Sequence, residues 1–300
     1  MLKTASARGD FAGVWTALVT PFRGGRINRQ MLAQLVESAL AAGLRGVVPL
    51  GSTGESAALD AAEQDAVIRR TVASAAGKLR VMVGAGTNNT PATIAKVRRA
   101  ADLGADAVLI VAPYYNKPTP VGLRRHFLTV ADNSPLPIVL YHIPGRCGVG
   151  IGLELVLELA KHPRIVGIKE AGGDVWRSAE IVRRAPRGFA VLSGDDPLTL
   201  PLLAVGASGV ISVISNLAPR LTRRLVDAAL NGDYKAALAM HQRLSPLMGI
   251  LGLETNPGPI KEAMNLAGLP VGQVRMPLAP VLPAARKAIR KALEQSGRLE

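Results

Sequence analysis

The sequence contains few of the residues from which disulfides and metal sites are built. Only one of its 300 residues is a cysteine, Cys147, and only four are histidines. A single cysteine excludes a disulfide within the chain, and the scattered histidines lack the paired spacing of metal ligands. We therefore expect no bound metal, and the chemistry of the protein has to come from other side chains.

Long hydrophobic runs are also absent. The most apolar window, residues 198–214, is interrupted by Pro201, Gly206 and Gly209, which is not the pattern of a membrane-spanning helix. Residues 1–10 are polar and lack the apolar core of a signal peptide. These absences predict a soluble, cytoplasmic protein without a membrane partner.

Acidic residues are the minority charge, with 22 against 36 basic residues and a net charge of +14. A basic chain can bind nucleic acid, but only 3% of these residues are aromatic, and the basic residues are scattered over predicted helices. The densest run, Arg286, Lys287, Arg290 and Lys291, has the spacing of an exposed helix face. We interpret the charge as a solvated surface, with attraction of anionic substrates as the weaker alternative, and expect no nucleic-acid partner.

The sequence does contain a repeated alternation of short apolar runs and longer amphipathic stretches, which is typical of parallel strands joined by helices. Eight such units predict an α/β fold, a TIM (β/α)8 barrel, because a doubly wound sheet usually stops at about five to seven strands. The predicted strands are 14–19, 46–50, 80–85, 107–112, 137–142, 165–170, 189–194 and 209–215, and the helices begin near residues 28, 60, 91, 119, 152, 175, 197 and 219.

Three further helices, roughly 233–252, 257–267 and 279–295, are predicted after the eighth unit. We therefore expect a catalytic barrel domain over residues 1–231 and a small C-terminal three-helix extension over residues 232–300.

Catalytic groups of a TIM barrel lie at the C-terminal ends of its strands. Lys169 is the only lysine inside a predicted strand, and it follows an apolar run, 165–168, where lysine is almost never placed for packing. Apolar surroundings disfavour the charged form of the amine and leave a nucleophile that forms a Schiff base with a ketone. The alternative is a structural ion pair of Lys169 with Glu170 or Asp195.

Tyrosines end or follow two neighbouring strands. Tyr141 ends the fifth predicted strand, and Tyr115 follows the fourth. A phenol is a poor base alone and needs a relay, which Ser52 and Tyr115 could provide for Tyr141. A tyrosine that only packs in the core is the alternative for Tyr141.

Two loops have groups that suit carboxylates. Residues 51–54, Gly-Ser-Thr-Gly, combine backbone N–H groups with the hydroxyls of Ser52 and Thr53, and predict a cradle for a small carboxylate; an ordinary helix-entry turn is the alternative. Arg146, in a predicted loop over 143–148, could bind a second carboxylate with two hydrogen bonds, unless it is only a surface arginine. Its neighbour Cys147 is interpreted as a small filler rather than a nucleophile.

Together these motifs resemble the dihydrodipicolinate synthase and N-acetylneuraminate lyase superfamily, over most of the chain. The segments that carry the resemblance are 17–22 (ALVTPF), 51–56 (GSTGES), 113–118 (PYYNKP), 141–146 (YHIPGR), 167–170 (GIKE), 193–196 (SGDD), 209–212 (GVIS) and 254–257 (ETNP).

The resemblance implies a class I aldolase in which Lys169 forms an imine with pyruvate. It implies that Ser52 and Thr53 hold the pyruvate carboxylate, that Tyr141 relays protons with Ser52 and Tyr115, and that Gly194 and Ile211 belong to the substrate-binding site. In the family the residue at the position of Tyr115 is lent across a dimer interface, so a homodimer or homotetramer is implied. The imine acts as the electron sink, so neither an organic cofactor nor a metal is implied.

The branch of the family decides the second substrate. Arg146 favours the synthase branch, which condenses pyruvate with aspartate β-semialdehyde to 4-hydroxy-tetrahydrodipicolinate in lysine and diaminopimelate biosynthesis. Ser52 stands where synthases more often have threonine, and His142 replaces a common asparagine. The alternative is another pyruvate-forming or 2-oxo acid lyase or dehydratase, acting on N-acetylneuraminate, a 2-keto-3-deoxy sugar acid, 4-hydroxy-2-oxoglutarate or a hydroxyproline-derived substrate.

Some synthases of this family are inhibited by lysine bound through His and Glu side chains. The matching positions here are Ala61, Gln64 and Ala92, although Asn88 and Tyr114 remain. We therefore expect weak or absent inhibition by lysine.

Overall fold

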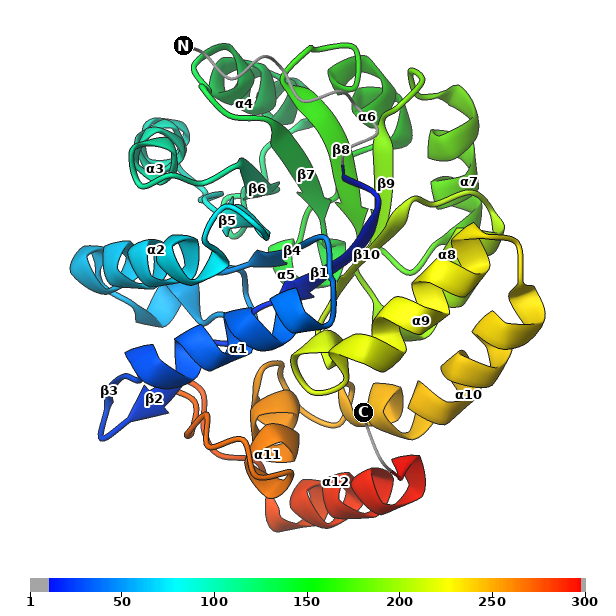
Figure 1. The fold of residues 1–300 in the computed structure, drawn as a ribbon. Helices are drawn as coiled ribbons and strands as arrows, with labels where there is room; N and C mark the ends of the chain where they lie inside the picture. The colour runs from blue at the N-terminus through cyan, green and yellow to red at the C-terminus, as the bar shows by residue number, and fades with distance from the viewer. Residues whose placement is uncertain (1–10, 298–300) are drawn as a thin grey trace. The chain divides into compact units, whose positions relative to one another are not determined.

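The computed structural model of the protein describes residues 11–297 (Figure 1). Within these residues, eight parallel strands close into a barrel in the order β1, β10, β9, β8, β7, β6, β5, β4. This confirms the predicted TIM barrel. The strands are β1 (Gly13–Ala17), β4 (Gly46–Val48), β5 (Arg80–Gly84), β6 (Ala107–Val111), β7 (Ile138–His142), β8 (Ile165–Glu170), β9 (Ala190–Ser193) and β10 (Gly209–Ser212).

Several helices begin at a residue whose side chain caps them. Asn28 accepts a hydrogen bond from the backbone of Met31 at the start of α1, and Asp60 and Glu63 form a capping box at the start of α2. Such caps satisfy backbone N–H groups that have no partner within the helix, so a local signal marks where the loops before these helices end. The helices are α1 (Arg29–Ala41), α2 (Ala61–Ala75), α3 (Thr90–Asp102), α4 (Pro120–Asp132), α5 (Pro144–Cys147), α6 (Leu153–Leu159), α7 (Val175–Arg184), α8 (Thr199–Ala204) and α9 (Pro219–Leu230).

The three predicted C-terminal helices are present as α10 (Tyr234–Ile250), α11 (Gly258–Leu266) and α12 (Pro283–Ser296). The last begins four residues later than expected, at a proline that suits the first turn of a helix. The basic run on α12 is exposed, as predicted. The proposed domain boundary between residues 231 and 232 stays a prediction.

Some short elements differ from expectation. A two-stranded hairpin, β2 (Phe22–Arg23) and β3 (Arg26–Ile27), was not predicted; it turns through Gly24 and Gly25, whose φ angles of 57° and 75° suit glycine. The predicted loop around Arg146 is wrong in part, because Pro144–Cys147 form the short helix α5. Three short 3₁₀ helices lie at Ser56–Ala58, Asp196–Leu198 and Ile214–Asn216.

The chain divides into two compact units. Among the described residues, unit 1 comprises 11–12 and 82–211, and unit 2 comprises 13–81 and 212–297. In unit 1, β6, β7, β8 and β9 pair side by side in parallel. In unit 2, α10 packs against α9 and α12. Residues 1–10, on which the expected absence of a signal peptide rests, lie outside the described part.

Candidate active site

Lys169 is buried on β8, with only 5% of its surface exposed. The register between β7 and β8 places Lys169 opposite Tyr141, so both side chains leave the sheet on the same face. Lys169 Nζ lies 4.3 Å from the centroid of the Tyr141 ring, and Tyr141 is 6% exposed. The predicted burial of Lys169 is therefore confirmed, and the predicted strand-end tyrosine lies beside it.

Gly194 leaves the space that the Lys169 side chain occupies. A Cβ at this position would lie 3.0 Å from Lys169 Cε and 2.8 Å from Ala171 Cβ. The Gly194 N–H also donates to the backbone carbonyl of Glu170, at 2.7 Å, which fixes the end of β8 against the end of β9. Any larger residue at position 194 would have to displace the lysine or the strand end.

Glu170 is not the partner of Lys169. Successive side chains of a strand point to opposite faces, and the carboxylate of Glu170 binds Arg177 Nε at 3.1 Å and the N–H of Gly172 at 3.0 Å. Burial raises the pKa of Glu170, and the Arg177 charge opposes that shift. The alternative of a Lys169–Glu170 ion pair is therefore wrong.

Asp195 is the other acidic neighbour. Burial raises the pKa of this carboxyl, and the positive charge of Lys169 opposes the shift. In the described part of the chain Lys169 forms an ion pair with neither carboxylate. The amine is therefore left for chemistry rather than fixed in a salt bridge.

His142, the last residue of β7, lies in the same polar cluster as Glu170 and Arg177. Its Nδ1 accepts a hydrogen bond from the backbone of Ile151 at 3.0 Å, and its Nε2 lies 3.5 Å from Glu170 Oε1. Burial first, and the charge of Arg177 second, lower the pKa of His142 to about 4. His142 is therefore neutral near pH 7, with its proton on Nε2 facing Glu170. Arg177 Nη2 adds a bond to the Ile151 carbonyl, at 2.7 Å.

Tyr115 and Arg146 lie on the surface of unit 1. Tyr115 is 88% exposed and has a φ of 72°, in the left-handed region that non-glycine residues rarely adopt. Arg146 is exposed on α5. Its neighbour Cys147 is buried, and burial raises the pKa of that thiol although the Arg146 charge opposes the shift. A protonated, buried thiol agrees with the interpretation of Cys147 as a filler.

The predicted carboxylate cradle follows β4 in unit 2. Gly54 N–H donates to the carbonyl of Gly51 at 3.0 Å, and Glu55 N–H donates to that of Ser52 at 3.1 Å, so the segment is a tight turn. Thr53 is 4% exposed. Its Oγ1 accepts a hydrogen bond from Asn256 Nδ2 at 2.9 Å, which leaves the single hydroxyl proton of Thr53 for another acceptor.

Ile211, the remaining predicted site residue, is 1% exposed on β10. Its side chain is apolar and offers no hydrogen-bonding atom. The structure thus brings Lys169, Tyr141 and Gly194 together in unit 1, and it joins Ser52 and Thr53 in one turn of unit 2.

Two charged residues near these loops were not predicted from the sequence. Arg177 binds Glu170, and Lys261, on α11, binds Glu55 at 2.8 Å. Residues 258–264 of α11 are all buried, so a lysine within an apolar segment was the available signal. The same signal, a lysine within a buried segment, marks Lys169 on β8.

No group of three or more His, Cys, Asp or Glu side chains in residues 11–297 is arranged to hold a metal ion. Over the same residues, no helix has the length and apolar character needed to cross a membrane.

Comparisons with known proteins agree over nearly the whole chain. Residues 10–296 match the model of the dihydrodipicolinate synthetase family. The 4-hydroxy-tetrahydrodipicolinate synthase of Methanosarcina barkeri is 44% identical over 292 residues, covering 97% of this chain and 100% of the relative. The solved structure of that enzyme from Methylacidiphilum fumariolicum SolV is 42% identical with a TM-score of 0.93, covering 95% of this chain and 96% of that one. The DHDPS of Cyanidioschyzon merolae, solved with lysine bound, is 38% identical with a TM-score of 0.93, covering 96% and 99%.

Proposed function

This chain belongs to the dihydrodipicolinate synthetase family, and on that premise we propose that it condenses pyruvate with aspartate β-semialdehyde to 4-hydroxy-tetrahydrodipicolinate, a step of lysine and diaminopimelate biosynthesis. The observation that carries the proposal is Lys169, buried on β8 beside Tyr141 and without a carboxylate partner. Relatives that bear the synthase name and cover nearly the whole chain support the choice of reaction.

The proposed chemistry begins with attack of the Lys169 amine on the ketone carbon of pyruvate. Loss of water gives a protonated imine, whose nitrogen accepts the electron pair when a C3 proton is removed. The resulting enamine adds to the aldehyde carbon, which restores the imine; the amino group of the semialdehyde then attacks the imine carbon and displaces the Lys169 amine, which closes the ring and frees the lysine. Tyr141, which lies against the lysine, is the group in unit 1 placed to carry protons for these steps. We propose that no metal or organic cofactor takes part.

The binding groups are assigned by their chemistry. Ser52 and Thr53 are proposed to hold the pyruvate carboxylate, because a tight turn directs their hydroxyls and N–H groups from one short segment. Arg146, on the exposed helix α5, is proposed to bind the carboxylate of the aldehyde. Gly194 and Ile211 are proposed to line the substrate.

A homodimer or homotetramer is proposed as the active form, in the cytoplasm. Tyr115 supports this, because an aromatic residue that is 88% exposed with a left-handed backbone is costly in an isolated chain. In a dimer it would complete the proton relay of Tyr141 and Ser52 in the partner subunit.

Another 2-oxo acid lyase of the family is the second candidate. Ser52 and His142 favour it, because the resemblance to synthases would more often place threonine at position 52 and asparagine at position 142. The two candidates share the imine and differ in the aldehyde, so an experiment can separate them.

The test is reduction with borohydride in the presence of pyruvate, followed by intact-mass and peptide mapping, and turnover of the same sample with aspartate β-semialdehyde. The expected result is one pyruvate adduct on Lys169 and rapid turnover. Lys161→Ala, at an exposed lysine, is the matched control and should still form the adduct. An adduct without turnover would favour the second candidate, and no adduct would contradict the proposal.

Arg146→Ala tests the second substrate. It should leave the pyruvate adduct intact but lower kcat/KM for aspartate β-semialdehyde by about 10- to 100-fold, the worth of a charge-assisted hydrogen bond. Unchanged kinetics would remove Arg146 from the site.

A further inference from the structure

Lys261 is the most deeply buried charged side chain of unit 2, at 1% exposed. Its ammonium donates to Glu55 Oε1 at 2.8 Å, to the carbonyl of Gln273 at 2.9 Å and to the carbonyl of Thr20 at 3.1 Å. It also lies 4.3 Å from the centroid of the Phe22 ring. Burial lowers the pKa of Lys261, and its bond to Glu55 opposes that shift. The three hydrogen bonds, to Glu55, Gln273 and Thr20, use all three protons of the ammonium group.

Glu55 is the last residue of the Gly51–Glu55 turn and is held from two sides. Its Oε1 binds Lys261, and its Oε2 accepts the backbone N–H of Arg275 at 2.8 Å. The backbone of Glu55 is left-handed, with a φ of 52°, a conformation that costs a non-glycine residue free energy. Two fixed partners for the carboxylate keep the turn in this conformation.

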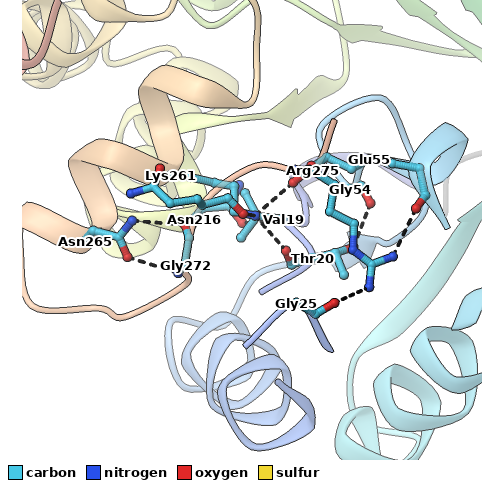
Figure 2. Close-up of polar contacts among 12 residues, drawn as sticks. Val19, Thr20, Gly25, Gly54, Glu55, Asn216, Lys261, Asn265, Gly272 and Arg275 are labelled. Carbon is cyan, nitrogen blue, oxygen red and sulfur yellow. Dashed lines mark hydrogen bonds and ion pairs between the residues drawn. The ribbon is translucent and has the colours of Figure 1, made fainter. Parts of the chain in front are cut away.

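The side chain of Arg275 extends the same scaffold. Its guanidinium binds both carboxylate oxygens of Glu63, at 2.6 and 2.7 Å, and donates to the carbonyls of Ala58 and Gly25. Figure 2 shows Arg275, Lys261 and Glu55 converging around Thr20. The segment that follows the turn is thus tied to the C-terminal part of the chain at several points.

The neighbouring residues of the turn are held as well. Thr20 Oγ1 donates to the carbonyl of Gly54 at 2.7 Å, and Asn256 donates to Thr53 Oγ1. A Cβ on Gly54 would lie 2.9 Å from the backbone nitrogen of Leu50, so the turn has no room to shift in that direction. Three consecutive residues, 53 to 55, therefore each have a fixed partner from outside the turn.

Stability alone does not account for this arrangement. A buried ion pair contributes little net stability compared with apolar side chains of the same volume. The ion pair of Lys261 and Glu55 instead fixes the hydroxyl and N–H groups of Ser52 and Thr53, which precede Glu55 in the turn. Holding donors rigidly before a ligand arrives is a way to raise affinity, because less freedom is lost on binding.

We propose that Lys261 and Asn256 are positioning residues for substrate affinity: Lys261 fixes the Gly51–Glu55 turn through Glu55, and Asn256 orients the Thr53 hydroxyl, so that the turn binds the pyruvate carboxylate. The inference rests on the proposed function and names residues of the C-terminal segment that act through the turn without touching the substrate.

The test compares wild type with the double variant Glu55→Gln/Lys261→Met, which removes both charges and leaves neither buried alone. The dependence of borohydride trapping on pyruvate concentration, kcat, KM for pyruvate and the thermal midpoint are measured. The expected result is a rise of about tenfold or more in the half-saturating pyruvate concentration with kcat within about threefold, the pattern of lost ground-state binding. Trapping at saturating pyruvate should still label Lys169.

The matched control is Glu262→Gln/Arg286→Met, which neutralises the ion pair between Glu262 of α11 and Arg286 of α12, at 2.7 Å, and should leave KM unchanged. Asn256→Ala is the second variant and should raise KM for pyruvate about tenfold, the worth of one hydrogen bond to a charged group. If the Glu55→Gln/Lys261→Met protein does not fold, Lys261→Arg takes its place: it keeps the charge but changes the geometry of the bond to Glu55, and it should also raise the half-saturating pyruvate concentration.

The outcomes separate the two hypotheses. Wild-type pyruvate dependence in a folded double variant would overturn the role of Lys261, and wild-type dependence in Asn256→Ala would overturn that of Asn256. In both cases the proposed function would stand. If wild type itself forms no adduct with pyruvate, the proposed function fails and this inference fails with it.

Discussion

The two units each place a buried carboxylate next to predicted site residues, but they neutralise it differently. Glu170, which follows Lys169, binds Arg177 only seven residues further along the chain. Glu55, which follows Ser52 and Thr53, binds Lys261 from 206 residues away. The predicted nucleophile is therefore supported by its own βα unit, whereas the predicted carboxylate cradle depends on a helix near the end of the chain.

This difference predicts which property of the protein a mutation in each unit should change. A local network such as that of Glu170 and Arg177 can be changed without touching the C-terminal helices. A long-range pair such as Glu55 and Lys261 ties helix α11 to the Gly51–Glu55 turn, so we expect changes in the residues that follow the barrel to affect this turn. The first unit should control the chemical step, and the second should control pyruvate affinity.

The largest effect is expected from Lys169→Ala. Without the amine no imine forms, so turnover should fall by roughly 10³-fold or more, as when a covalent nucleophile is removed from other enzymes. Trapping with borohydride and a kinetic assay measure the two losses. Retained turnover would refute the assignment of the nucleophile and, with it, the division of roles between the units.

The strands and the buried lysine of unit 1 were largely predictable from the sequence. The strand periods located all eight strands, and a lysine after four apolar residues, 165–168, marked Lys169 because both signals are local. The hairpin at 22–27 and helix α5 were missed because two to four residues carry no measurable period, although Gly24-Gly25 and Pro144 were usable turn and helix signals.

The support of unit 2 was not predictable in the same way. No pattern in one sequence pairs Glu55 with a lysine 206 residues away, because that contact depends on how α11 packs. The left-handed backbone of Glu55 has no propensity signal either, since tertiary contacts impose it. The roles of the predicted site residues remain predictions, which Lys169→Ala and Arg146→Ala test directly.

The second largest effect is expected for Arg177→Met, on stability. It leaves the carboxylate of Glu170, 1% exposed, without its cation, and the free energy of unfolding should fall by about 3–5 kcal/mol, the cost of breaking a buried pair. Urea unfolding measures this. Arg183→Met, on the same helix but in an exposed pair with Glu180, is the control and should change little. Equal effects of the two variants would mean that the Glu170 network is not a support.

A smaller effect is expected in the pH dependence of stability, from His142. Its pKa is lowered from 6.5 to about 4 by burial, so the unfolded chain takes up a proton that the folded chain does not. The stability due to this group is present above pH 6.5 and is lost as the pH falls toward 4, by about 3 kcal/mol in all.

His142→Asn should remove that part of the slope while retaining a polar side chain. His126, whose pKa burial also lowers to about 4, stays in the variant, so the difference between the two proteins is the quantity to measure. Glu170 has the opposite sign, because its raised pKa favours the folded state as the pH falls. Identical slopes in urea unfolding between pH 7 and pH 4.5 would show that His142 is not held neutral.

The smallest effect is expected from free lysine. The family resemblance implies that Ala61, Gln64 and Ala92 stand where a lysine-inhibited synthase would carry His and Glu side chains. Gln64 belongs to the unit 2 scaffold instead: its amide donates to the carbonyls of Ser56 at 3.1 Å and Leu59 at 2.9 Å, so both amide protons are already used. We expect the dissociation constant for lysine to lie well above 1 mM, where the binding free energy is less than about 4 kcal/mol. Lysine at about 1 mM should therefore leave the rate nearly unchanged.

Isothermal titration with lysine, alongside the Cyanidioschyzon merolae relative as a binding control, tests this together with the rate. Half-inhibition well below a millimolar would contradict the prediction, and it would mean that Gln64 can leave the loop that follows Glu55. In that case Gln64→Ala should abolish the inhibition. If lysine has no effect, Gln64→Ala should lower stability and leave KM for pyruvate unchanged. The Gly51–Glu55 turn then depends on Lys261 of α11 rather than on Gln64 of α2.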